Sequence, residues 1–456
     1  MLRRSHTPKL NNEEGFTLLE SVIAMVMVAI IVISAVSLFS TNIISLQLGN
    51  SRSAGLALAN EKMELFRDLP YDSLATQNGD IYPGGTIADN QEVTRNNIKF
   101  RVNTRIKYVD DPFDGNAEGT VPNKPTDFYN YDYKQAEIKV YTVNDNRLAA
   151  TLTTNISGKA AETATNTGIL RIKVLDANGL PVEAASVNIT NASLTPALNL
   201  NSTTDTNGLL VLPKLPPDSS HRYKITVSKS GYSSDETMAD PAGSQTPVLI
   251  NPNVLVQQIS DVTLSIDRTS NLNINAVDTS GNPIANVPIT ITSSKLIFTN
   301  PNVAKTTRTI SSDSNGVSTL GTIPWHSYSV SVGGGYNIAS SSPYQPYSVD
   351  PNTSPTLKVV LTTNGSFPRI TSVSPDTETT GNANATLTIN GANLTGASVK
   401  LQRNGESDIN GTGITGSGGS ISANLNLSNA APGNWNIVVS TAAGTITQEA
   451  GLYVSP

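Results

Sequence analysis

The chain has 456 residues, of which 14% are charged, and its formal net charge is -6. A length of this order predicts about three or four domains. The acidic balance argues against direct binding of nucleic acid, and the absence of cysteine excludes a disulfide framework and thiolate chemistry. Asn, Thr, Ser and Gly are abundant beyond residue 150, which favours short strands and turns over helices.

The N-terminal region predicts a membrane-spanning helix. Residues 1–15, MLRRSHTPKLNNEEG, are basic through Arg3, Arg4 and Lys9, so this end should remain in the cytoplasm. No charged residue lies within 21–51, and the central stretch VIAMVMVAIIVISAVSLF holds neither Gly nor Pro. A helix of that length reaches about 27 Å, which is near the thickness of the hydrocarbon core.

Glu20 lies at the edge of this apolar segment. A carboxylate within a transmembrane helix costs about 2.5–3.5 kcal/mol, so it usually has a partner. A plain membrane anchor and a secretory signal peptide, cut within ISAVS or GLALAN, are alternatives, but neither explains Glu20. The stretch GFTLLES, from Gly15 to Ser21, resembles the cleavage and methylation motif of type IV prepilins.

That resemblance implies a processing site and an assembly contact. A prepilin peptidase would cut between Gly15 and Phe16, and Phe16 would then be N-methylated. Glu20 would pair with the Phe16 amine of a neighbouring subunit, because opposite charges attract strongly where the dielectric is low. Such a pair would set the register between helices as subunits enter a filament.

The helix is expected to continue beyond the membrane. Apolar residues recur at helical spacing within Asn50–Leu69, and Pro70 should end the helix. The stretch EKMELFRDLPYDSL, Glu61–Leu74, is similar to the same region of minor pseudopilins of the I type and minor pilins of the V type. Alternating strands are expected at 97–109, 133–143 and 148–156. They predict a small β-meander packed on the helix.

Beyond residue 168 the chain repeats itself. The stretch LRIKVLDANGLPVEAASVNIT, Leu170–Thr190, aligns with LNINAVDTSGNPIANVPITIT, Leu272–Thr292. Thr204–Pro216 likewise aligns with Ser312–Pro324. Short alternating strands with turn signals predict two homologous β-sandwiches, and their order of elements resembles the carboxypeptidase regulatory-like domain family. The last unit, residues 367–456, resembles an immunoglobulin-like fold of the IPT/TIG type.

No residue pattern predicts catalysis, a cofactor or a metal site. Asp-x-Asn-Gly recurs at 176–179, 205–208 and 313–316, and it is interpreted as a hairpin turn because no Glu completes a calcium loop. His221 and His326 are interpreted as turn residues, and Trp435 as a core residue. The Gly-rich stretch 410–420 is expected to be a flexible loop.

The sequence therefore predicts an α+β chain. A long N-terminal transmembrane/pilin helix with a small β-meander should be followed by three all-β immunoglobulin-like sandwiches. The expected bounds are 1–15 for the leader, 16–69 for the pilin helix with its membrane-spanning part at about 21–44, 70–157 for the pilin-type β domain, 158–168 for a linker, and 169–268, 269–363 and 364–456 for the three sandwiches.

These features favour a minor subunit of a type IV pilus-like filament over an enzyme. Its implied partners are the prepilin peptidase, other pilins or pseudopilins through the helix, the inner-membrane assembly platform, and the membrane before assembly. The sandwiches would then lie at the cell surface for adhesion to a surface ligand or carbohydrate, an analogy at the level of the fold. A minor pseudopilin of a type II secretion system and a membrane-anchored surface binding module are the alternatives.

Overall fold

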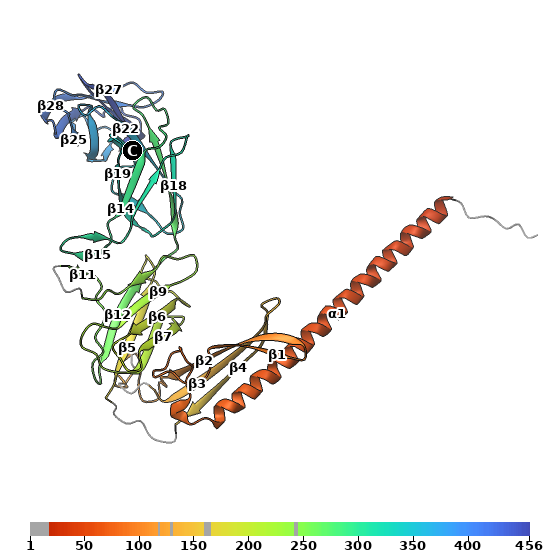
Figure 1. Cartoon of the computed structure of the whole chain (residues 1–456). Coiled ribbons are helices and arrows are strands. Elements are labelled where there is room, and N and C mark those ends of the chain that lie inside the picture. Colours follow the sequence, from red (N-terminus) through yellow and green to blue (C-terminus); the bar gives the residue numbers. More distant parts are fainter. Residues whose placement is uncertain (1–17, 117–118, 128–130, 159–165, 241–244) are drawn as a thin grey trace, which may run out of the picture. The chain divides into compact units, whose positions relative to one another are not determined.

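The computed structural model describes residues 18–116, 119–127, 131–158, 166–240 and 245–456 (Figure 1). The chain divides into two compact units. One contains the N-terminal helix and the strands up to residue 157. The other contains the segments 80–83 and 110–131 together with the chain from residue 162 onwards.

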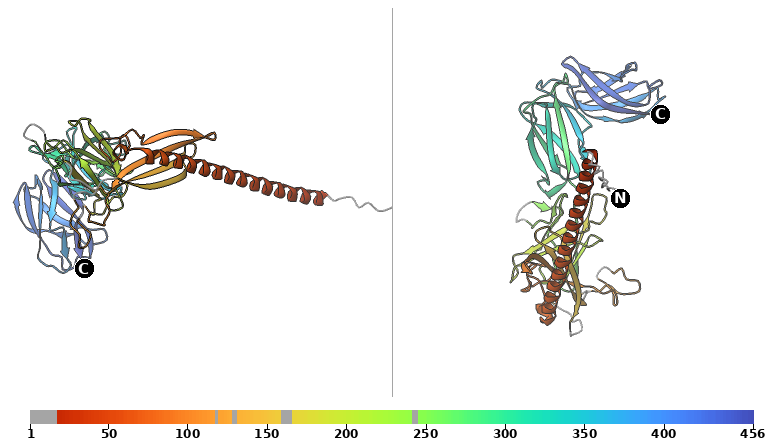
Figure 2. Two further views of the ribbon diagram at one scale, coloured as in Figure 1. Left: turned by 90° about the horizontal axis from the view of Figure 1, so that it is seen from below. Right: turned by 90° about the vertical axis from the view of Figure 1, so that its right-hand side faces the viewer.

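The first unit is built on α1 (Leu18–Asp68), which runs as one uninterrupted helix (Figures 1 and 2). A single 3-10 turn, Tyr71–Ser73, follows Pro70, which cannot continue a helix. The later half of α1 buries Ala54, Gly55, Leu58, Ala59, Met63 and Phe66. A Cβ atom at Gly55 would lie 2.8 Å from the Cβ of Ala149, so glycine permits the close approach of helix and sheet.

The sheet of this unit has the strand order β1-β2-β3-β4 and is antiparallel throughout. Its strands are β1 (Asn90–Arg95), β2 (Ile98–Val109), β3 (Tyr133–Thr142) and β4 (Leu148–Ser157). Alternation buries one face, including Phe100, Ile106 and Ile138. The three strands expected from the pattern are confirmed, and β1 is an additional one at the edge.

The first sandwich contains two sheets, of the orders β12-β5-β8 and β10-β9-β6-β7. Its strands are β5 (Gly168–Leu175), β6 (Ser186–Asn191), β7 (Leu198–Thr203), β8 (Leu209–Leu215), β9 (Lys224–Ser228), β10 (Asp235–Glu236), β11 (Thr246–Pro247) and β12 (Ile259–Ser265). β12 pairs with β5 in parallel, whereas β8 pairs with β5 antiparallel. Inward-facing residues such as Ile172, Val187 and Tyr223 fill the space between the sheets.

The second sandwich repeats this arrangement, with the sheet orders β18-β13-β22-β20 and β17-β14-β19-β21. Its strands are β13 (Ser270–Val277), β14 (Pro288–Ser293), β15 (Leu296–Thr299), β16 (Val303–Ala304), β17 (Thr307–Ser311), β18 (Val317–Ile323), β19 (His326–Val332), β20 (Asn337–Ser342), β21 (Tyr347–Val349) and β22 (Thr356–Thr362). β13 takes the place of β5, and it also has a parallel partner on one side and an antiparallel partner on the other. The internal alignment therefore corresponds to a repeated fold.

The third sandwich has the sheet orders β23-β25-β29-β28 and β24-β31-β30-β26-β27. Its strands are β23 (Arg369–Ser374), β24 (Thr377–Thr379), β25 (Ala385–Ala392), β26 (Ser398–Gln402), β27 (Ile409–Asn410), β28 (Thr412–Ser417), β29 (Ser420–Leu425), β30 (Gly433–Thr441) and β31 (Gly444–Ser455). The prediction that 410–420 is a flexible loop is wrong. Most of it forms β28, because its backbone pairs with β29 and Ile414 packs against the core.

Candidate functional site

The N-terminal half of α1 is the candidate site for membrane insertion and assembly. Glu20 lies in the first turn of the helix and is exposed, whereas Gly15 and Phe16 lie outside the described residues. Large apolar side chains along 18–46 are each between 48% and 84% exposed. Among the described residues, α1 is the helix long and apolar enough to cross a membrane, and the apolar window that meets this criterion has no buried residue.

The hydroxyl groups of Ser34, Ser40 and Thr41, in the apolar half of α1, donate hydrogen bonds inside the helix. Ser34 donates to the carbonyl of Ile30 at 2.8 Å, and Ser40 donates to the carbonyl of Val36 at 2.9 Å. A hydroxyl without a hydrogen bond is costly in hydrocarbon, so these bonds fit a lipid environment. The first half of the helix extends beyond the sheet of its own unit (Figure 2), which leaves its apolar surface available to lipid or to other helices.

The repeated Asp-x-Asn-Gly segments are confirmed as turns. The carboxylate of Asp176 accepts the backbone N–H groups of residues 178 and 180, both at 2.8 Å. Asp205 and Asp313 make the same two bonds. Asp278, which the sequence pattern did not include, makes them as well. Within the described part of the chain, His, Asp and Glu residues form no group of three that could hold a metal ion.

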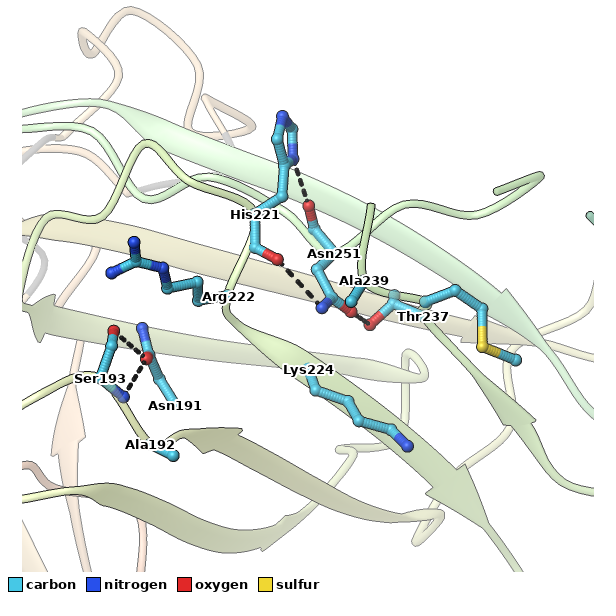
Figure 3. A pocket seen from close by; sticks show the side chains of 10 residues that line it. Asn191, Ala192, Ser193, His221, Arg222, Lys224, Thr237, Ala239 and Asn251 are labelled. Atoms are coloured by element: carbon cyan, nitrogen blue, oxygen red, sulfur yellow. Dashed lines mark hydrogen bonds between the residues drawn. The ribbon is translucent and has the colours of Figure 1, made fainter. Parts of the chain in front are cut away.

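A pocket of about 570 Å³ opens on the first sandwich (Figure 3). Its lining includes the exposed cationic side chain of Lys224 and the nearly inaccessible Asn191, Thr237 and Asn251. Thr237 donates to Oδ1 of Asn251 at 2.6 Å, and Nδ2 of Asn251 donates to the carbonyl of His221 at 3.1 Å. Thr237 and Asn251 therefore fix the loop that carries His221, whereas Asn191 donates to the carboxylate of Asp218 at 2.9 Å.

His221 is confirmed as a turn residue, with φ at +54°. Its Nδ1 lies 2.6 Å from the carbonyl oxygen of Asn251, and its Nε2 lies 3.2 Å from Nδ2 of Asn253. A carbonyl can only accept, so Nδ1 carries the hydrogen and Nε2 accepts. Because both ring nitrogens are engaged, the imidazole is placed to hold the loop rather than to activate a nucleophile.

His326, at the equivalent place in the second repeat, is not a turn residue. It begins β19, where it pairs with Val349 of β21, so the prediction of a turn is wrong there. Trp435 is confirmed as a core residue, since it is 1% exposed and its Nε1 donates to the carbonyl of Ala431 at 2.9 Å. The pocket residues Asn191, Thr237 and Asn251 carried no sequence signal, because only the fold brings them together.

Residues 169–277 match the carboxypeptidase regulatory-like domain family. No curated protein is significantly similar to the chain. Among solved structures, the Bacillus anthracis TIE protein is 14% identical over 71% of this chain and 58% of its own, a little over half its length, with a TM-score of 0.17. GBS52, the minor pilin of Streptococcus agalactiae, is 14% identical over 42% of this chain and 95% of its own, with a TM-score of 0.21. A streptococcal ancillary pilin is 11% identical over 49% of this chain and 75% of its own, with a TM-score of 0.22. The family match covers the first repeat, whose order of sequence elements resembles the same family.

Proposed function

We propose that the chain is a minor subunit of a type IV pilus-like filament. The observation that carries this proposal is the prepilin-like motif Gly15–Ser21, which leads into a helix whose apolar window has no buried residue. In the proposed order of events, the helix first lies in the cytoplasmic membrane. The peptidase then cuts after Gly15, and an inner-membrane assembly platform moves the subunit into the filament.

The two halves of α1 have different surroundings, which supports a different role for each half. The half around Leu58 and Phe66 packs on the sheet of its own unit, so it positions the β domain. The half around Ile30 has no such cover and would pack against helices of neighbouring subunits. In that bundle, Glu20 would pair with the methylated amine of a neighbour's Phe16, because opposite charges attract strongly where the dielectric is low and either charge left there alone would be costly.

Two substitutions test the proposed processing and assembly. Gly15→Ala should block the cut, and a normally trimmed N-terminus by mass spectrometry would refute the motif. Glu20→Ala should leave the cut intact but strongly reduce incorporation into filaments. Glu64→Ala is the matched control, because Glu64 lies on the same helix but forms an exposed ion pair with Arg67. Equal incorporation of the Glu20 and Glu64 variants would refute the pairing role.

The three sandwiches would be carried at the surface, where they could contact other cells or carbohydrate. Their bulk relative to the pilin part supports a minor rather than a major subunit. A minor pseudopilin of a type II secretion system is the second candidate, because the same N-terminal motif serves both. Mass spectrometry of sheared fibres decides between them: peptides from 169–456 with a methylated Phe16 favour the pilus, and a processed chain found solely in membranes favours the pseudopilin.

A further inference from the structure

The two homologous repeats differ in one connection. In the first repeat, six residues, 192–197, join β6 to β7. In the second repeat, thirteen residues, 294–306, join the equivalent strands β14 and β17. The longer connection contains the hairpin β15–β16, so the second repeat carries an element that the first repeat lacks.

This added hairpin pairs with the first repeat rather than with its own sandwich. β15 is hydrogen-bonded to β11, which belongs to the first repeat, and the three strands form a separate sheet of the order β11-β15-β16. The N–H of Val248 donates to the carbonyl of Ile297 at 3.0 Å, and the hydroxyl of Thr299 donates to the carbonyl of Thr246 at 3.3 Å. Both repeats lie within the same compact unit.

The hairpin also carries two lysines to one aspartate of the first repeat. Nζ of Lys305 lies 2.6 Å from Oδ1 of Asp235, and Nζ of Lys295 lies 3.2 Å from Oδ2. The Asp235 side chain is only 9% exposed and that of Lys305 15%, so the cluster is largely shielded from water. Lys305 also donates to the carbonyl of Ser234 at 2.7 Å, and the N–H of Ser265 donates to Asp235 at 3.2 Å.

The charges of this cluster depend on one another. Burial raises the pKa of Asp235, but the ammonium groups of Lys305 and Lys295 outweigh it and hold that pKa below its ordinary value. Asp235 therefore remains a carboxylate at neutral pH. If Asp235 lost its charge, Lys295 and Lys305 would lose the carboxylate that both of them contact, which is unfavourable where water is largely excluded.

We propose that residues 294–306 form a clamp that locks the two repeats together, with Asp235 as its charged anchor. The clamp has a backbone part, the pairing of β15 with β11, and an ionic part, the contacts of Lys295 and Lys305 with Asp235. Under a pulling force, the two repeats then behave as one rigid element rather than as two domains that move independently. This inference rests on contacts within the repeats and is independent of the proposed pilus function.

Hydrogen–deuterium exchange of the full chain in detergent micelles tests the clamp. Asp235→Asn keeps the shape of the side chain and removes its charge. We expect amides of β11 and β15 to exchange on the order of a hundredfold faster in this variant, while β5 and β13 keep their protection. Asp261→Asn is the matched control, because it removes the ion pair with Arg171 inside the first repeat. Unchanged exchange at the joint in Asp235→Asn would overturn the proposal.

A second variant covers the case in which Asp235→Asn unfolds the first repeat. The double substitution Lys295→Met and Lys305→Met removes the cations of the hairpin and leaves every residue of the first repeat in place. Faster exchange confined to β11 and β15 would support the clamp. Protection equal to that of the unmodified chain, or loss of protection throughout the first repeat, would overturn it.

Discussion

Mild acid should destabilise the second sandwich through His326. Its ring lies beside Trp325, with the ring centroids 5.0 Å apart. Burial, and then the ammonium groups of Lys295 and Lys305, lower the pKa of His326 from 6.5 to about 4. Folding thus favours the neutral imidazole, so this contribution to stability is complete above pH 6.5 and is lost as the pH falls towards 4. The shift corresponds to at most about 3 kcal/mol, and to about 1–2 kcal/mol once the partial exposure of the ring is included.

Urea unfolding followed by the fluorescence of Trp325 measures this effect. The chain has two tryptophans, so Trp435→Phe leaves Trp325 as the sole reporter. In that background the urea midpoint should fall between about pH 7 and about pH 5, and His326→Gln should abolish most of the fall. His221→Gln is the matched control, because it changes the equivalent position of the first repeat. A variant without His326 that keeps the full pH dependence would refute the reasoning.

The remaining predictions concern hydrogen bonds and packing. Tyr223→Phe and Tyr328→Phe should each lower the unfolding free energy of their repeat by about 1 kcal/mol in chemical denaturation, since each hydroxyl donates to a proline carbonyl. Trp435→Ala should cost the third sandwich about 3–5 kcal/mol, seen as proteolysis of that sandwich alone, because the ring is buried and hydrogen-bonded. Gly55→Leu should loosen α1 from β4 by about 1–3 kcal/mol in thermal unfolding, because even a Cβ atom would lie 2.8 Å from a side chain of β4. Gly49→Ala should leave the packing of α1 on β4 unchanged, because nothing lies within 4 Å of a Cβ atom at that position.

Segments in which apolar residues recur at regular spacing were predictable, because one face of each is buried. In β2, Phe100, Val102 and Ile106 point inwards at alternate positions, and the pattern fixed that strand to within one residue. The Asp-x-Asn-Gly turns were predictable for a local reason as well. The carboxylate of Asp205 bonds two N–H groups within four residues, so no distant partner is needed.

Elements that depend on a distant partner were not predictable from local pattern. β28 contains Gly413 and Gly416, which weaken a strand locally, yet pairing with β29 makes it extended. His326 lies at the same position in its sequence repeat as His221, but pairing with β21 places it in a strand. The pocket of the first sandwich joins Asn191 to Asn251 across sixty residues of chain, so nothing in the sequence marks it.

The comparison of the two repeats indicates where their roles diverge. Their interiors are equivalent, since Ile172 and Ile274 occupy matching strands and both are fully buried. The divergence lies in one connection. In the first repeat the short connection contributes Ala192 and Ser193 to the edge of an open pocket. In the second repeat the longer connection, 294–306, pairs with the first repeat instead. The two repeats therefore share the same core and differ in this connection, which lies at the edge of a pocket in the first repeat and pairs with the neighbouring repeat in the second.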